Sequence, residues 1–336
     1  MSAPISLADL TDLASAVLER AGTAPAAARS VAAALVAADA DGLASHGVSR
    51  LPAYADQVAS GKVAGHAVPQ VERVGAAALR VDAADGFAFP AVDSAIAEAL
   101  AMLPTAGVVT AAIANSHHFG AAGYAVERIA AKGAIGLAFS NSPGAIAPWG
   151  GSKPLFGTNP IAFACPRAGD QPPLVIDLSL SLVARGKVMV AAQKGEAIPE
   201  GWALDAEGHP TTDAKAALAG TMLPMGGAKG AALVLMVELL TAALTGSNAG
   251  FEASSFFTAD GPPPRIGQLL VLINPGPLSA NRFAERVETI LTAMLAEPGV
   301  RLPGSRRLSL RAKAEAEGVT IPPALMTTLL RYRDGA

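Results

Sequence analysis

Residues 114–129 read ANSHHFGAAGYAVERI, where a short apolar run leads into a helical pattern through a turn that holds Gly120 and Gly123. Small residues at such a turn let backbone N–H groups approach a phosphate at the N-terminus of the helix. Neither G-x-G-x-x-G nor G-x-x-x-x-G-K-[ST] occurs in the chain, so a standard Rossmann crevice or P-loop is not expected. A plain strand–helix turn is the alternative interpretation of this stretch.

Outward from this turn, the chain alternates short apolar runs with helical stretches. Strands are predicted by runs at about 71–83, 106–116, 134–142, 159–167, 173–181 and 267–276, which Gly, Pro, Asn and Ser bound. Helices are predicted at about 6–20, 24–40, 88–103, 120–133, 230–246, 279–296 and 308–317. Ser6 and Asp9 form a capping-box-like start to the first helix. The Pro run within residues 252–267 predicts a loop.

This order predicts an α/β body between two helical ends. We expect a non-Rossmann fold with a mixed, largely antiparallel sheet, flanking helices and a helical unit built from both termini. Residues 1–70 would form an N-terminal helical region and residues 71–278 the α/β body. Residues 279–336 would supply C-terminal helices that return to the N-terminal unit.

The composition limits the classes of function. Of 336 residues, 51% are hydrophobic and 16% are charged, which indicates a large core and surface buried in an oligomer interface. The net charge of −3 gives no electrostatic reason to expect nucleic acid or an anionic membrane as a partner. Cys165 is the single cysteine, so no intrachain disulfide is expected and a cytoplasmic location fits. The segment MSAPISLADL has no signal-peptide pattern.

The most apolar segment, residues 230–246, is shorter than the roughly 20 residues that a membrane span needs. It also carries Glu238, whose charge would be costly in lipid. We therefore expect a buried core helix, in or near a dimer core, and no membrane partner.

The stretch DGLASHGVSRLPAYADQVASG over residues 41–61 holds a histidine, an arginine and a tyrosine within nine residues. His46 can give and take a proton near neutral pH, so it is the first candidate for acid–base work. Ser45 could orient it or relay a proton, the forked Arg50 suits a carboxylate, and Tyr54 would share a helix face with Arg50. Helix-capping and surface roles are the alternative. A Ser–His nucleophile pair is not expected, since adjacent residues rarely meet and no G-x-S-x-G elbow occurs.

Further candidates lie elsewhere in the chain. His117 and His118 are adjacent, so their side chains should diverge, and no C-x-x-C, H-E-x-x-H or acidic cluster accompanies them; we expect no metal site. One of the two could touch a nicotinamide or a substrate. Asp177 ends a predicted strand, where it could bind a ribose or a catalytic histidine, or only cap a turn. Lys229 follows a Gly-Gly pair ahead of a helix and could bind a phosphate or a carboxylate.

Nine segments resemble, in order, the motifs of one known family. They are DGLASHGVSRLPAY, NSHHFGAAGY, FSNSPGAIAPWGG, FGTNPIAFACPR, VIDLSLSLVARGKV, EGWALDAEGHPTTD, GGAKGAALVLMVELL, PPRIGQ and RLPGSRR. The family is the malate/L-lactate dehydrogenase type 2 family of NAD(P)-dependent oxidoreductases, and the resemblance covers about residues 6–330. It implies a non-Rossmann α/β fold with an NAD(P)-binding body, and a homodimer with active sites near the subunit interface.

The resemblance also implies the site residues. Ser45 and His46 match a relay and a proton donor, and Arg50 matches a carboxylate site; in one branch the histidine of NSHHFG transfers the proton instead. Candidate catalytic residues are then His46, Ser45, His118 and, as a relay aspartate, Asp177, and candidate substrate contacts are Arg50, Tyr54, His117 and Lys229. The implied cofactor contacts are His118, Phe119, Gly120, Ala121, Ala122, Ser140, Ser142, Asp177, Leu178, Ser179, Lys229, Gly304, Arg306 and Arg307.

Two segments, residues 177–205 and 219–232, are most similar to the Δ1-piperideine-2-carboxylate/Δ1-pyrroline-2-carboxylate reductase branch. The expected function is therefore NADPH-dependent reduction of these cyclic imino acids to L-pipecolate and L-proline, by hydride transfer to C2. A 2-hydroxyacid dehydrogenase of malate, lactate, sulfolactate or ureidoglycolate type is the alternative. A catalytically silent protein on this fold is a third hypothesis, against which the intact set of site residues argues. Arg306 and Arg307 could bind the 2′-phosphate that NADPH carries, whereas two exposed capping arginines would leave NADH possible.

Overall fold

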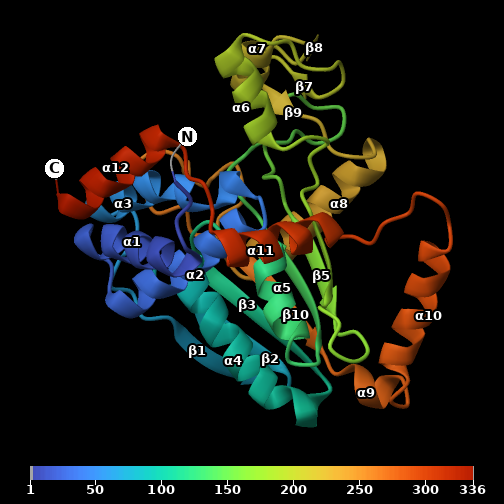
Figure 1. Cartoon of the computed structure of the whole chain (residues 1–336). Coiled ribbons are helices and arrows are strands. Elements are labelled where there is room, and N and C mark those ends of the chain that lie inside the picture. Colours follow the sequence, from blue (N-terminus) through green and yellow to red (C-terminus); the bar gives the residue numbers. More distant parts are fainter. Residues whose placement is uncertain (1–2, 336) are drawn as a thin grey trace.

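The computed structural model describes residues 3–335, and a seven-stranded sheet runs through its α/β body (Figure 1). The strand order is β1-β2-β3-β10-β4-β5-β6, and every neighbouring pair is antiparallel except β2 and β3. The expected mixed, largely antiparallel sheet is confirmed. Its strands are β1 (Gln70–Gly75), β2 (Ala78–Asp82), β3 (Val108–Ser116), β4 (Ile135–Ser140), β5 (Ile161–Cys165), β6 (Leu174–Leu178) and β10 (Ile266–Ile273).

Helices surround this sheet. They are α1 (Leu7–Arg20), α2 (Pro25–Ala40), α3 (Leu51–Ala59), α4 (Ala88–Ala106), α5 (Ala122–Ala130), α6 (Arg185–Lys194), α7 (Ala214–Ala219), α8 (Ala228–Glu238), α9 (Pro275–Leu278), α10 (Phe283–Leu295), α11 (Ser305–Glu317) and α12 (Pro323–Asp334). Two single 3₁₀ turns, η1 (Ala44–His46) and η2 (Val48–Arg50), precede α3.

The main core lies between the sheet and the helices α4 and α5. The helix α4 packs on β3, and α5 packs on β4 and β5. Alternate residues of the strands point toward these helices, so Val81, Ile113 and Leu270 are buried with Ile129 of α5. The turn at Gly120 joins β3 to α5, and its φ of +70° together with a close approach to Phe89 requires glycine there.

The two ends of the chain meet in a layer of helices. The helix α12 packs on α1 and α3, and Leu10, Leu35 and Leu329 share one core there. The cap on α1 is as expected, because Ser6 Oγ accepts a hydrogen bond from Asp9 N at 3.0 Å. In Figure 1, α11 and α12 lie against the N-terminal helices, whereas α10 stands apart from them at the right, beyond β5. The helix α12 was not expected from the sequence. The division of the chain at residues 70 and 278 stays a prediction.

A small lobe at the top of Figure 1 was also not expected. It joins α6 and α7 to a three-stranded sheet of β7 (Ala203–Leu204), β8 (Pro210–Thr211) and β9 (Thr221–Met222). Val183, Val188, Ile198 and Ala203 are part of its own core. Strands of two residues carry too little alternation to be seen in a sequence.

The apolar segment at 230–246 forms α8 and a π-helical turn, η3 (Leu239–Ala243). In the single chain this helix is buried on one side only, and its burial in or near a dimer core stays a prediction. Val234 and Val237 are buried, but Leu235 is 45% and Leu239 is 55% exposed, so the helix has one open apolar face. Glu238 lies on the buried side, where it accepts hydrogen bonds from Asn141, Asn159 and Gly250. Within residues 3–335 no helix is both long and apolar enough to cross a membrane.

Candidate active site

An aspartate near the end of α2 holds the turn that carries Ser45 and His46. Asp39, near the end of α2, accepts a hydrogen bond from Val48 N at 2.7 Å through its Oδ2. Gly47 presses on the same carboxyl group, since a Cβ on Gly47 would lie 2.0 Å from Asp39 Oδ1. Burial, only partly offset by the Val48 bond, raises the pKa of Asp39 to about 6. Sequence reasoning missed Asp39, although its place two residues before the DGLASHG stretch was a usable signal.

Ser45 and His46 contact each other directly. Ser45 Oγ lies 3.0 Å from His46 Nδ1, so the expectation that adjacent residues would not meet is wrong. The tight 3₁₀ turn brings the two side chains to one side of the backbone. Arg50 closes the same turn, because its Nε donates to Ser45 O at 2.7 Å. One hydroxyl, one imidazole and one guanidinium therefore share a single short segment.

His118 joins this group from the other side of the site. Its ring stacks on that of His46 with the centroids 5.6 Å apart, and its Nδ1 lies 2.6 Å from Tyr54 Oη. Tyr54 is fully buried, and burial raises the pKa of its hydroxyl, which therefore keeps its proton. A buried hydroxyl needs an acceptor, so Tyr54 donates to Nδ1 and the proton of neutral His118 resides on Nε2. The tyrosine thus makes His118 a hydrogen-bond donor at Nε2.

His117 points into the protein instead. Its Nε2 donates to Gln57 Oε1 at 2.8 Å, and the residue is 1% exposed between the rings of Tyr54, Phe87 and Phe256. Burial, with smaller contributions from Lys62 and Arg50, lowers the pKa of His117 to about 3. The two histidines therefore have different partners, and the structure gives His117 an enclosed position. Its contact with a substrate stays a prediction.

Burial also controls the protonation of His46. Desolvation, followed by the charge of Arg50, lowers the pKa of His46 to about 4. The premise that this histidine titrates near neutrality is therefore wrong for the free protein, in which the imidazole is neutral at pH 7. The pKa of His118 is lowered as well, first by burial and then by Arg50 and its neighbouring histidines.

The guanidinium of Arg50 is held in place, but not all of its hydrogen-bond donors have a partner. Its Nε is used by Ser45 O, the ring of Phe257 covers one face of the guanidinium at 4.6 Å, and its Nη1 is buried without a hydrogen-bond partner among the described residues. An unpaired buried donor of a cation is costly. An anion placed at Nη1 would remove that cost, which makes this atom the strongest indication of a carboxylate site.

The segments expected to contact a cofactor lie next to one another. Asp177, at the end of β6, accepts a hydrogen bond from Gly123 N at 2.7 Å and so caps the start of α5. The loop at Gly304 approaches β6 as well, since a Cβ on Gly304 would lie 3.4 Å from Val175 O. The hydrogen bond of Asp177 goes to this backbone amide and to neither histidine, so its role as a relay aspartate stays a prediction.

Ser142 and Ser179, two more of the residues expected to contact the cofactor, both bond to Thr158. Ser142 Oγ accepts a hydrogen bond from Thr158 N at 3.1 Å, and Ser179 Oγ donates to Thr158 O at 3.4 Å. Leu180 O then accepts from Met225 N at 2.9 Å, just ahead of α8, where Lys229 is exposed. The segments at Gly123, Ser142, Ser179 and Gly304 therefore lie along one strip, and its binding of a cofactor stays a prediction.

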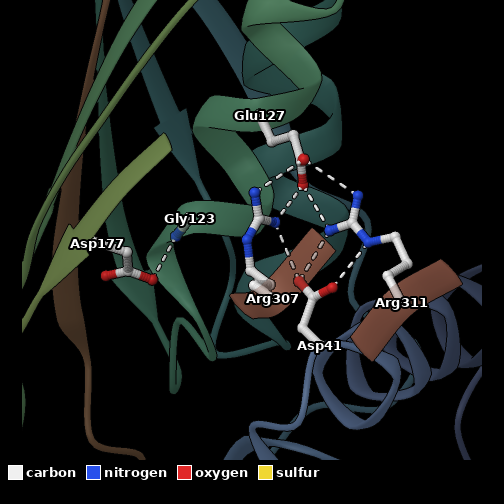
Figure 2. A network of polar contacts seen from close by, with 6 residues as sticks. All are labelled: Asp41, Gly123, Glu127, Asp177, Arg307 and Arg311. Carbon is white, nitrogen blue, oxygen red and sulfur yellow. Dashed lines mark hydrogen bonds and ion pairs between the residues drawn. The ribbon is translucent and has the colours of Figure 1, made fainter. Parts of the chain in front are cut away.

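Figure 2 shows the ion-pair network beside this strip. Arg307 and Arg311 of α11 both bind Glu127 of α5 and Asp41 at the end of α2, with N–O distances of 2.7–3.0 Å. Burial alone would raise the pKa of Glu127, but the two arginines outweigh it and lower that pKa. The network ties the helical unit to the sheet through α11.

Arg306 has a different environment from Arg307. It is exposed and lines a cavity of about 450 Å³ together with Gly42, Leu43 and Arg301. Arg307 also lines this cavity, but both terminal nitrogens of its guanidinium contact carboxylates. Of the two arginines expected at a 2′-phosphate, Arg306 is therefore the one with a free side chain, and such a basic, open cavity fits a phosphate group.

Comparison with known proteins agrees with this geometry. The sequence profile of the malate/L-lactate dehydrogenase family matches residues 5–330. A (2R)-3-sulfolactate dehydrogenase (NADP(+)) of Chromohalobacter salexigens is 53% identical over 99% of this chain and 98% of its own. A Δ1-pyrroline-2-carboxylate/Δ1-piperideine-2-carboxylate reductase of Pseudomonas putida is 45% identical over 96% of both chains.

Solved structures give the same result. The crystal structure of Δ1-piperideine-2-carboxylate reductase from Pseudomonas syringae has a TM-score of 0.93 and 42% identity, and the match covers 98% of this chain and all of the other. Sulfolactate dehydrogenase from Methanocaldococcus jannaschii has a TM-score of 0.90 and 29% identity, over 99% of this chain and 97% of the other. This chain belongs to the malate/L-lactate dehydrogenase family and is an NAD(P)-dependent oxidoreductase.

Proposed function

We propose that this protein uses NADPH to reduce Δ1-piperideine-2-carboxylate to L-pipecolate and Δ1-pyrroline-2-carboxylate to L-proline. The observation that carries the proposal is the buried, unpaired Nη1 of Arg50 one helical turn from His46. A planar 2-imino acid has one carboxylate and, next to it, the C2=N bond that is reduced. Binding the carboxylate at Arg50 places that bond near the imidazole. Relatives of 45% and 43% identity that carry the reductase name support this substrate class.

In this proposal each residue has a separate task. NADPH, when bound, supplies the hydride that is added to C2. His46 provides the matching proton to the imine nitrogen of the substrate. Ser45 forms a hydrogen bond with Nδ1 of His46 and so fixes the tautomer of the imidazole. Arg50 grips the carboxylate and so decides which face of C2 is presented, which sets the L-configuration. His118, with its proton on Nε2, donates a hydrogen bond toward the reacting atoms.

Substrate binding and protonation of His46 are coupled. Arg50 lowers the pKa of His46 in the free protein, and the carboxylate of a bound substrate neutralises the charge of Arg50. The pKa of His46 should therefore rise when the substrate binds. Burial, the larger cause of the lowered pKa, remains in the complex.

The cofactor contacts would lie on the strip from His118 to Ala122, Ser140 to Ser142 and Asp177 to Ser179, with Lys229 and the loop at Gly304. We propose a preference for NADPH over NADH because exposed Arg306 lines the cavity at this loop. The sulfolactate dehydrogenase relative is named for NADP(+). Replacing Arg306 by Ala should weaken NADPH binding by about tenfold and leave NADH binding unchanged. An equal effect on both cofactors would contradict this assignment.

We also propose a homodimer located in the cytoplasm. The open apolar face of α8, with Leu235 and Leu239 exposed, is the kind of surface that an oligomer buries. Analytical ultracentrifugation should give twice the mass of one chain, and Leu235→Asp should shift the protein toward the monomer. A monomeric wild-type protein would contradict the proposal.

A 2-hydroxyacid dehydrogenase of the sulfolactate type is the second candidate, favoured by the relative of 53% identity. Consumption of NADPH with the two cyclic imino acids, pyruvate, oxaloacetate and 3-sulfopyruvate separates the two functions. We expect kcat/KM for a cyclic imino acid to exceed that for every 2-oxo acid by at least about tenfold, which is the discrimination that one apolar group provides. A higher value with 3-sulfopyruvate would establish the alternative.

A further inference from the structure

The loop that the Pro run predicted forms a wall of the site. Residues 249–265 contain no regular helix or strand, and two consecutive phenylalanines of this loop face the catalytic residues. Phe256 is 5% exposed and packs on His117 and His118, with ring centroids 5.2 and 5.0 Å away. Phe257 is 50% exposed and lies over the guanidinium of Arg50.

The end of α3 and the residues after it hold this loop in place. The ammonium group of Lys62 donates to the carbonyl oxygens of residues 255, 258 and 260 at 2.7–3.0 Å. Gln57 Nε2 donates to Phe256 O at 2.9 Å, and Ser60 Oγ donates to Ala259 O at 3.1 Å. Because an ammonium has three N–H groups, Lys62 has no donor left for a substrate. The loop is therefore a fixed wall, and this lysine does not provide a second cationic subsite.

The wall covers one side of Arg50. Its Nε is bonded to Ser45 O, one face of the guanidinium is covered by Phe257, and Nη1 is enclosed without a hydrogen-bond partner among the described residues. A carboxylate bound by this guanidinium would lie near the ring of Phe257, which is 50% exposed. The atoms of the substrate that follow the carboxylate thus meet a phenyl surface, which favours methylene groups and penalises a second anion.

We propose that Phe257 is the specificity-determining residue of this enzyme and selects substrates with one carboxylate and an apolar ring over substrates with two anionic groups. The inference rests on the proposed reductase function and specifies which substrates that reductase prefers. The cyclic imino acids have three or four methylene groups to place against the ring. The sulfonate of 3-sulfopyruvate would lose hydration there without gaining a cation.

The test compares Phe257→Ser with Phe251→Ser, a control at a phenylalanine of the same loop that is 62% exposed. For each protein, kcat/KM is measured with NADPH and either Δ1-piperideine-2-carboxylate or 3-sulfopyruvate. The Phe257→Ser variant should reduce the preference for the cyclic imino acid by about tenfold or more, through loss of apolar contact. The control should keep the wild-type ratio. A ratio that changes less than twofold in Phe257→Ser, or equally in the control, would overturn the proposal.

A binding measurement separates this proposal from the proposed function. Calorimetry on the NADP⁺-saturated protein gives the Kd of pyridine-2-carboxylate, a planar ring with one carboxylate, and of sulfoacetate, which has two anionic groups. The wild type should prefer the ring compound, and Phe257→Ser should lose about tenfold of that preference. Wild type that reduces neither substrate would refute the reductase function, whereas an unchanged Kd ratio would refute the role of Phe257.

Discussion

Replacing Asp39 by Asn should change how the stability of the protein depends on pH. The carboxyl group is largely buried against the catalytic turn, and its pKa is raised from an ordinary 3.8 to about 6. One pKa unit corresponds to about 1.4 kcal/mol, so ionisation of Asp39 costs the native state about 3 kcal/mol relative to the unfolded chain. A raised pKa means that the stabilisation is fully present below pH 3.8 and is lost as pH rises through about 6.

Asparagine does not titrate, and its carbonyl oxygen can still accept the bond from Val48. The difference in unfolding free energy between wild type and Asp39→Asn should therefore move in favour of the variant as pH rises. The change should be about 1.5 kcal/mol between pH 5 and pH 8, since part of the total is already lost at pH 5. Urea unfolding of both proteins at constant ionic strength measures it. A difference that stays constant within about 0.5 kcal/mol would refute the reasoning.

Four further outcomes are expected. His46→Ala should lower kcat by about 10² to 10⁴ with little change in the Kd of NADPH. Near-normal turnover of this variant in steady-state assays would assign the role of proton donor to His118 instead. Arg50→Lys should lower kcat/KM much more than kcat, because a point charge cannot replace the fork, and equal losses in steady-state kinetics would contradict this. Tyr54→Phe should lower kcat by about tenfold. The 15N chemical shifts of His118 should then report a mixture of the two tautomers, and a single unchanged tautomer would contradict the idea that Tyr54 fixes the proton on Nε2. Arg311→Met should destabilise the fold by about 2 kcal/mol in thermal unfolding, less than for a fully buried pair because the side chain is 25% exposed; an unchanged midpoint would show that Arg307 suffices.

The sequence was most informative where one segment carries the whole signal. The apolar runs became strands because their side chains alternate between the two faces of the sheet. Ser6 capped α1 because the cap and its target are three residues apart. The run at 71–83 proved to be the hairpin of β1 and β2 rather than one strand. The two-residue strands of the small lobe and the helix α12 lack a strong local pattern.

The site was harder to predict because its contacts join distant parts of the chain. Ser45, His46 and Arg50 were found since they share one turn. The bond from Tyr54 to His118 spans 64 residues and the bonds from Lys62 to the Phe256 loop span more than 190, so neither follows from spacing. The pKa of His46 depends on burial that only the assembled fold creates.

The packing of α12 on α1 and α3 has a consequence for synthesis of the protein. Leu329 completes a core whose other buried side chains belong mostly to the first 63 residues. At translation rates of about 5–20 residues per second, the ribosome needs roughly 15–60 s to make the intervening chain. During that time Leu10 and its neighbours lack their final cover, and Ile5 lacks the backbone pairing that it makes with Val319. The helical unit that carries His46 should therefore complete its packing only after α12 has left the ribosome.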